Sequence, residues 1–199
     1  MARLFLDRHE VLEDKPGKWD NNAPVLTRMW HQTGAGAVMI ILGVDPGTTA
    51  TGYGIITKNR VHSTHLASGV IKTSPQLSMS RRLWEIHQRL ETVIVEHAPQ
   101  VMVVESLFHF KNTQSLMKLC QVRGVILLLG ERHSMEIHEY APMEIKKGIT
   151  GYGAADKAQV MFMVGKVLGL TDLKSPDRAD ALAMALYHSH VSIPERVGP

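Results

Sequence analysis

Four acidic residues stand where a carboxylate is costly unless a cation or a hydrogen-bond network compensates its charge. Asp45 and Glu105 each come directly after an apolar run of the chain. Asp177 and Asp180 open the last apolar-periodic segment and are three residues apart, so on a helix they share one face. Carboxylate oxygens that converge from several chain segments suit a hard divalent ion such as Mg²⁺. The pattern therefore predicts a metal site.

Each of these acids also has a plainer interpretation. Asp45 begins Asp-Pro-Gly, which is common turn chemistry. Acids in the first turn of a helix, such as Asp177 and Asp180, stabilise the helix dipole. Glu105 is harder to explain in this way, because it closes a strand of four apolar residues where a carboxylate would be partly buried. Taken together, the four acids favour the metal site.

The elements that would position these acids are strands first and then alternating helices and strands. Hydrophobic periodicity and turn residues predict strands over 38–44, 53–57, 65–73, 101–105 and 135–140, and helices over 78–97, 112–132, 142–149, 154–168 and 176–189. The first three strands are expected to form an antiparallel meander, and the apolar strand 101–105 to lie centrally. Ser175 is expected to cap the last helix and Pro176 to open it. This order predicts an α/β fold, a mixed sheet with helices on both faces.

Length and composition indicate one domain that buries a sizeable core. The chain has 199 residues, of which 44% are hydrophobic and 21% charged. Its single cysteine, Cys120, excludes an intrachain disulfide and favours a reducing cytoplasm. No apolar run approaches the roughly 20 residues that span a membrane. The net charge of +3 permits nucleic-acid binding without requiring it.

The first 38 residues differ from the rest of the chain. They carry equal numbers of acidic and basic residues, and the stretch 15–24 has the proline, glycine and asparagine of a loop. We expect residues 1–38 to be a mobile or non-native appendage, with Met39 as a possible native start; a genuine short N-terminal element is the alternative. The main domain is then 39–192, followed by a tail over 193–199.

Five ordered motifs resemble those of the RuvC family of Holliday junction resolvases. They are LGVDPGTTATGYG at 42–54, VESLFHFKNT at 104–113, CQVRGVI at 120–126, TGYGAADKAQV at 150–160 and DRADALAMALYHSH at 177–190. The resemblance implies an RNase H-like fold, a five-stranded mixed sheet flanked by helices. It also implies a homodimer that nicks two opposed strands of a four-way DNA junction, leaving 5′-phosphate and 3′-hydroxyl ends, and that works with the RuvA–RuvB branch-migration complex.

Position by position, the resemblance makes Asp45, Glu105, Asp177 and Asp180 the catalytic carboxylates. Hydrolysis of a phosphodiester by two divalent ions about 4 Å apart needs such oxygen ligands. We expect two Mg²⁺ or Mn²⁺ ions per subunit, with Asp45 between them. These are the same four residues that the positions of the acids select.

Aromatic and basic residues near the motifs are candidate DNA contacts. Phe108 matches an aromatic of the family that can stack on an unpaired base or open a base step, while Phe110 is the better candidate for packing into the core. Lys146 and Lys157 match basic positions that the family uses for DNA binding and catalysis, although each could be a solvated surface charge. Further candidate contacts are Phe110, Lys111, Lys147, Arg81, Arg123 and Arg178.

The chain departs from the family pattern in two places. Leu116, Cys120 and Val122 are bulkier than the small residues expected in a helix that contributes to the family's dimer contact. Arg178 stands where a small residue is usual, which would put a cation near the metal site, where it could bind phosphate instead.

Three other functions compete with the resolvase. Asp45 and the following Gly47-Thr48-Thr49 also resemble the phosphate loop of actin-like ATPases, but those proteins need a second such domain and this chain is too short. A non-catalytic junction-binding module would keep the lysines without needing four convergent carboxylates. The shorter RNase H-like YqgF type is a related enzyme, from which the Phe108 loop and the two C-terminal aspartates distinguish this chain.

Overall fold

The computed structural model describes residues 38–106 and 112–192. In chain order its elements are β1 (Met39–Asp45), β2 (Ala50–Lys58), β3 (Ser63–Lys72), α1 (Met79–His97), β4 (Val101–Glu105), α2 (Thr113–Arg132), β5 (Glu136–Tyr140), α3 (Pro142–Thr150), α4 (Lys157–Leu168) and α5 (Pro176–Val191). Among these, no helix has both the length and the apolar character needed to cross a membrane.

The five strands form one mixed sheet in the order β3-β2-β1-β4-β5. Strands β1, β2 and β3 are the expected antiparallel meander, whereas β4 and β5 continue the sheet in parallel with β1. In the β1–β4 pair, Val44 lies opposite Val104. The last residues of the two strands, Asp45 and Glu105, therefore end at the same edge of the sheet.

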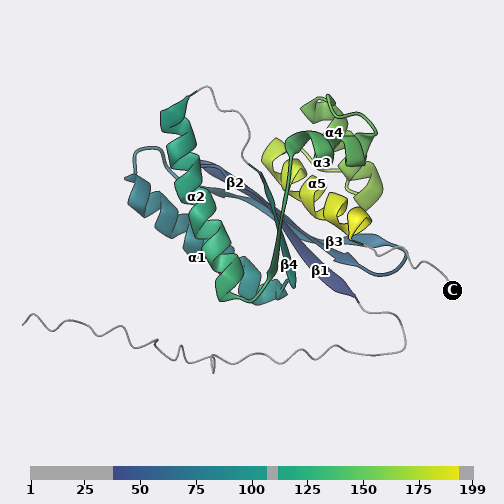
Figure 1. Ribbon diagram of the computed structural model, residues 1–199, viewed down its shortest axis with the longest axis horizontal. Helices are drawn as coiled ribbons and strands as arrows, with labels where there is room; N and C mark the ends of the chain where they lie inside the picture. Colours follow the sequence, from purple (N-terminus) through teal and green to yellow (C-terminus); the bar gives the residue numbers. More distant parts are fainter. Residues whose placement is uncertain (1–37, 107–111, 193–199) are drawn as a thin grey trace, which may run out of the picture.

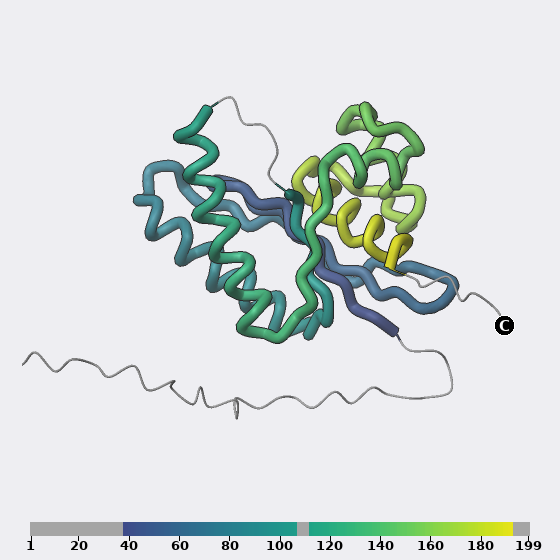
Figure 2. The backbone as a smooth tube through the Cα atoms, in the orientation of Figure 1, coloured from purple at the N-terminus to yellow at the C-terminus, as the bar shows by residue number. Residues whose placement is uncertain are grey.

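Helices cover both faces of the sheet, as the sequence predicts (Figure 1). Alternate residues of β1 point to opposite faces: Leu42 and Val44 pack with α1 and α2, while Ile41 packs with α3, α4 and α5. Both faces of β1 and β4 are covered, which accounts for their continuous apolar sequences. Figure 2 shows the first strand and the last helix packed together, although they lie at opposite ends of the described chain.

Three glycines let α5 lie unusually close to the sheet. Gly43 of β1 and Gly54 of β2 are cross-strand partners, and Gly52 is the partner of Asp45. A Cβ atom at Gly43 would lie 2.0 Å from the carbonyl oxygen of Ala181, and one at Gly52 would lie 2.0 Å from the carbonyl oxygen of Asp177. We call Gly43, Gly52 and Gly54 the glycine strip. Its lack of side chains allows backbone-to-backbone packing of α5.

Three local predictions need correction. The helix expected from residue 154 begins at Lys157, because Asp156 and Gln159 form a capping box in which each side chain accepts a hydrogen bond from the backbone of the other. Ser175 occupies the N-cap position of α5, but its side chain makes no capping hydrogen bond; Pro176 opens the helix as expected. Strand β2 is longer than 53–57 because its pairing with β1 continues as far as Gly52, opposite Asp45.

Replacing Gly52 by alanine should destabilise the protein, because the new methyl group would overlap the backbone of α5. We expect the free energy of unfolding to fall by about 1–3 kcal/mol, the usual cost of overpacking. Urea unfolding followed by circular dichroism measures this change.

The matched control is Gly124→Ala in α2, where an added Cβ meets no atom within 4 Å. Because alanine favours a helix over glycine, this variant should be neutral or stabilised by up to about 1 kcal/mol. Both variants are compared at dilutions where the unfolding midpoint no longer depends on protein concentration. If the two behave alike, α5 does not depend on the glycine strip for its position.

Candidate active site

The ends of β1 and β4 place two of the four acids side by side. Asp45 and Glu105 follow the paired residues Val44 and Val104 of parallel neighbouring strands. By strand alternation, Asp45 is on the same face as Ile41, and Glu105 on the same face as Val103, which is the face covered by α5. Both side chains are partly buried. The parallel pairing thus brings two carboxylates from distant parts of the chain to one site.

The first turn of α5 supplies the other two acids. The backbone of Asp177 lies directly over Gly52, the cross-strand partner of Asp45. Asp180 is one helical turn further along and, like Asp177, is partly buried. The close packing on the glycine strip is therefore what brings the α5 acids next to the strand-end acids.

The charges of these acids affect one another strongly. Burial, followed by the nearby carboxylates of Asp180, Glu105 and Asp177, raises the pKa of Asp45 from 3.8 to about 8. Burial and then Asp180 raise the pKa of Glu105. Burial is also the main cause that raises the pKa of Asp180. All four acids thus belong to one electrostatic cluster, which we call the carboxylate cluster.

Two lysines partly offset the negative charge of the cluster. Lys157 at the start of α4 has its Nζ 3.5 Å from an Oδ2 of Asp180. The charges of Lys157 and of Lys146 on α3 both lower the pKa values of Glu105 and Asp180. The structure thus brings together six of the residues that the sequence selected. Lys147 is exposed, and its charge is not among those that shift the pKa values of Asp45, Glu105 and Asp180.

The residues of the cluster fit a hard divalent cation. They offer only carboxylate oxygens, the ligands that such ions prefer. Burial, and after it the charges of the three other carboxylates, raises the pKa of Asp45, and a bound cation would favour its ionised form. Within residues 38–106 and 112–192, no three of these side chains already converge on a single point as metal ligands would. A bound cation would offset the repulsion between these carboxylates.

The turn that follows Asp45 is held by hydrogen bonds on several sides. The Thr51 hydroxyl donates to the carbonyl oxygen of Gly47 at 2.8 Å. The carbonyl oxygen of Thr48 accepts from the Thr73 hydroxyl at 2.7 Å and from Nη1 of Arg82 at 3.3 Å. The turn is therefore tied to the residue that follows β3 and to α1.

Arg123 does not lie at the surface, as a DNA contact would. It is 8% exposed, and its guanidinium donates to the backbone carbonyl oxygen of Glu105 and forms an ion pair with Glu139 of β5. Because the Arg123 side chain is buried and its guanidinium already contacts Glu105 and Glu139, little of it is exposed for contact with DNA. Its contact with Glu105 indicates a different role.

The other candidate arginines also lie apart from the carboxylates. Arg178 turns toward β3, where its Nε donates to the Ser68 hydroxyl at 2.7 Å, because successive residues of a helix point about 100° apart. Arg81 is exposed on α1 and pairs with Glu85 at 3.8 Å. Three further candidates, Phe108, Phe110 and Lys111, lie outside the described residues.

The helix α2 presents an apolar outer surface. Met117 is 61% and Leu128 is 64% exposed, and Cys120 is exposed as well. Val122, in contrast, is fully buried in the core with α1 and the sheet, so its bulk is no obstacle to contacts on the outer surface. Leu116 is partly buried.

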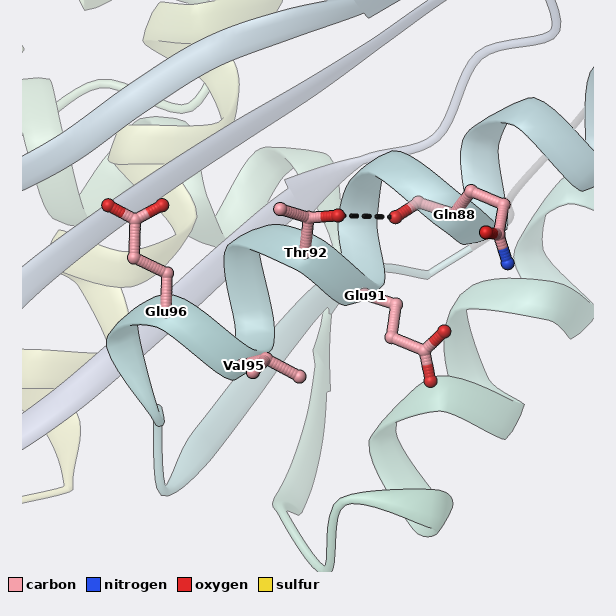
Figure 3. A pocket seen from close by; sticks show the side chains of 5 residues that line it. All are labelled: Gln88, Glu91, Thr92, Val95 and Glu96. Atoms are coloured by element: carbon pink, nitrogen blue, oxygen red, sulfur yellow. Dashed lines mark hydrogen bonds between the residues drawn. The ribbon is translucent and has the colours of Figure 1, made fainter.

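An open hollow on α1 is unrelated to the cluster. It is lined by Gln88, Glu91, Thr92, Val95 and Glu96 (Figure 3). The helix that carries it covers the opposite face of the sheet from α5. Glu91 there is already paired with Arg132. Nothing about this hollow suggests chemistry.

Comparison with known proteins identifies close sequence relatives. A family model described as crossover junction endodeoxyribonuclease RuvC matches residues 41–188. A relative with this description from Pelodictyon phaeoclathratiforme is 44% identical over 149 residues, 74% of this chain and 78% of the relative. Another, from Natranaerobius thermophilus, is 44% identical over 152 residues, 76% of this chain and 94% of the relative.

Solved structures agree with the sequence relatives. The RuvC of Thermus thermophilus in complex with a Holliday junction substrate matches with a TM-score of 0.71 and 33% identity, covering 76% of this chain and 93% of that one. This match confirms the RNase H-like fold. The yeast mitochondrial resolvase Ydc2, at a TM-score of 0.56 and 11% identity over 75% of this chain and 77% of that one, shares the fold alone.

The raised pKa of Asp45 makes stability without added metal fall as pH rises. Between the unfolded value near 3.8 and the folded value of about 8, the folded protein holds a proton that the unfolded chain has released. The lowered pKa values of His65, His188 and His190 have the opposite effect at the acidic end of this range. The contribution of Asp45 to the free energy of unfolding in EDTA should decrease from pH 5 to pH 8, by at most about 1.4 kcal/mol per pH unit. Asp45→Asn should flatten this decrease in urea unfolding experiments.

Asp172→Asn is the matched control, because the Asp172 side chain is 79% exposed and, among the described residues, pairs only with the exposed Lys174. Its pH dependence should run parallel to that of the wild type. Parallel curves for Asp45→Asn as well would show that Asp45 carries no such electrostatic cost.

Proposed function

This chain belongs to the RuvC family of crossover junction endodeoxyribonucleases, and we propose that it resolves four-way DNA junctions by paired, symmetric nicks that leave 5′-phosphate and 3′-hydroxyl ends. The observation that carries the proposal is the carboxylate cluster. Asp45, Glu105, Asp177 and Asp180 come from three separate segments of the chain and share one electrostatic environment. Phosphodiester hydrolysis with metal ions requires such a set of oxygen ligands.

The four carboxylates and the two neighbouring lysines would have different tasks in this reaction. The four carboxylates would hold the divalent cation, which when bound supplies positive charge for the phosphate and for the leaving oxygen. Lys157 and Lys146, on the side of the cluster formed by α3 and α4, would attract and position the scissile phosphate. An ionised carboxylate can also accept a hydrogen bond from the attacking water and so orient it.

Family membership makes the reaction metal-dependent, and we assign Mg²⁺ or Mn²⁺ as the ion, with two ions per subunit. The all-oxygen donor set supports a hard ion. Four carboxylates carry enough negative charge for two dications once the neighbouring substrate phosphate also contributes. Burial and the repulsion between these carboxylates, which together raise the pKa of Asp45, would both be relieved by bound cations.

Paired nicking needs two active sites, and a second copy of this chain would supply the other one. The outer surface of α2, with Met117, Cys120 and Leu128, is the surface that we assign to the dimer contact. An added Cβ at Gly124, on the same helix, meets no atom within 4 Å, so a partner helix could approach there closely. A two-fold dimer would pair this surface with itself.

The remaining assignments rest on the family resemblance and the sequence. We assign the RuvA–RuvB branch-migration complex as a partner, and the cytoplasm as the location, with which a single unpaired cysteine is compatible. Phe108, followed by Phe110 and Lys111, remains the candidate for contact with unpaired bases at the junction centre.

Cleavage of a synthetic four-way junction tests the proposed function. The wild type should cut with Mg²⁺ or Mn²⁺ and not with EDTA. Asp45→Asn should lose at least about 100-fold in single-turnover rate, equivalent to about 2.7 kcal/mol of barrier, yet bind the junction in EDTA as tightly as the wild type or more tightly, because it removes a negative charge near the phosphates. Asp172→Asn serves as the control for both measurements. Metal-independent cutting, or more than about a tenth of the wild-type rate in Asp45→Asn, would contradict the assignment.

Charge introduced into the outer surface of α2 should separate the subunits. Met117→Glu and Leu128→Glu should each shift the protein to monomer in sedimentation experiments at micromolar concentration, because a carboxylate would be buried in the contact. On a cruciform plasmid, coupled nicks give linear DNA, and the two variants should give nicked circles instead.

Val95→Glu is the control for this pair, since Val95 is 67% exposed on α1 and lies outside the assigned surface. It should remain dimeric and produce linear DNA. Dimeric Met117→Glu and Leu128→Glu proteins would place the subunit contact elsewhere.

A further inference from the structure

Two buried arginines lie beneath the strands that carry the catalytic acids. Arg82 of α1 and Arg123 of α2 are each 8% exposed. Among the arginine, lysine, aspartate and glutamate residues of 38–106 and 112–192, they are the only two that are buried. Burial of a charge costs free energy, and a well-packed apolar residue in its place is often neutral or stabilising. Two such charges in one small core therefore need an explanation beyond stability.

Both guanidinium groups donate to backbone carbonyl oxygens next to proposed metal ligands. Arg123 donates to the carbonyl oxygen of Glu105 itself. Arg82 donates to the carbonyl oxygen of Thr48, three residues after Asp45, in the turn that fixes the end of β1. Neither contact involves a side chain of the carboxylate cluster. The arginines therefore act on the position of the backbone from which the acids project.

The two contacts come from the face of the sheet opposite α5. Helices α1 and α2 pack on one face, and α5 with Asp177 and Asp180 packs on the other (Figure 1). The strand ends that bear Asp45 and Glu105 thus lie between the two arginines on one side and the α5 acids on the other. Hydrogen bonds from the arginines therefore hold the strand ends from the face opposite the α5 acids.

The hydrogen bonding of each arginine fits a positioning role better than a general stabilising one. Arg123 also pairs with Glu139 of β5, so it joins the end of β4 to the next strand. Nε of Arg82 is buried with no hydrogen-bond partner in the described part of the chain. A buried donor left unpaired is a cost that a purely structural residue would avoid.

We infer that Arg82 and Arg123 are positioning residues, which hold the backbone at Asp45 and Glu105 in the geometry that binds the divalent cation. This inference rests on the proposed function, because the acids that it positions are the proposed metal ligands. It also accounts for Arg123 without a DNA contact. In this role both arginines act through the strand ends, and the charge of Arg123 in addition lowers the pKa of Glu105.

The test compares Arg82→Met and Arg123→Met with Arg81→Met and Arg132→Met. Arg81 is exposed beside Arg82 on α1, and Arg132 is exposed at the end of α2, where it pairs with Glu91. Mn²⁺ binding by titration calorimetry, without DNA, is the first readout. Supporting groups around metal ligands typically contribute about 10–100-fold to metal affinity or activity, so at least about a tenfold loss of Mn²⁺ affinity is expected in the two buried variants and none in the controls.

Stability and cleavage separate positioning from folding. Both buried variants should remain folded, since the Thr48 carbonyl oxygen keeps its bond from Thr73 and the half-exposed Glu139 can return to water. Single-turnover cleavage should fall by at least about tenfold at low Mn²⁺ and recover partly at high Mn²⁺. Junction affinity in EDTA should stay within about twofold of the wild type, as a group that contacts no phosphate requires.

Arg82→Lys and Arg123→Lys keep the charge but lose the planar fork of donors. If a methionine variant fails to fold, the lysine variant carries the test, and it should lose Mn²⁺ affinity in the same direction. Wild-type Mn²⁺ affinity and cleavage in all folded variants would overturn the inference, as would a loss of junction affinity in EDTA. If the wild type binds Mn²⁺ more tightly than the variants but cuts no junction, the proposed function fails and the positioning role stands.

Discussion

Mutual repulsion of four carboxylates is the constraint on which the rest of this structure depends. Asp45, Glu105, Asp177 and Asp180 are gathered where burial weakens hydration, and each ionised group makes the next one harder to ionise. Attraction between these side chains cannot hold the site together, because there is none. The backbone must therefore hold them, through strand pairing, close helix packing and buried hydrogen bonds.

The sheet and its two helical layers share that task. Parallel pairing of β1 with β4 fixes the distance between the first two acids, and the glycine strip fixes the depth at which α5 delivers the other two. Lys157 and Lys146 reduce the net charge from the side of α3 and α4. The carboxylates that would bind a cation therefore destabilise the folded protein when no cation is bound. Functional sites commonly lower stability in this way.

The fold and the acids were predictable because each depends on local pattern. Apolar runs, helical periodicity and turn residues located all ten elements, and an acid at the end of an apolar run is visible without a structure. The glycine strip also left a signal, since Gly43, Gly52 and Gly54 interrupt strands where glycine is otherwise unfavourable. Their shared contact with α5, however, depends on the register of β1 with β2, which no local pattern specifies.

The arginines illustrate what the sequence does not reveal. Arginine is usually exposed, so Arg123 in CQVRGVI reads as a surface charge, and Arg178 between two acids reads as part of their site. The sequence does not show which side of α2 faces the sheet, because both sides are apolar. Met117 and Leu128 lie on the exposed side, and Val122 and Ile126 on the buried side. The buried position of Arg123 and the turn of Arg178 toward Ser68 follow from tertiary packing alone.

The packing of α5 on β1 also bears on how the protein is made. During synthesis on the ribosome, β1 emerges among the first described elements and α5 emerges last, so the backbone contacts over Gly43 and Gly52 form only when nearly the whole domain has been translated. Contacts between such distant segments slow folding, because the intervening chain must be ordered before they can form. A truncated or half-folded chain would lack Asp177 and Asp180 at the sheet edge. Such a chain could not assemble the full set of acids, so an unfinished nuclease would be unable to cut the genome of the cell that is making it.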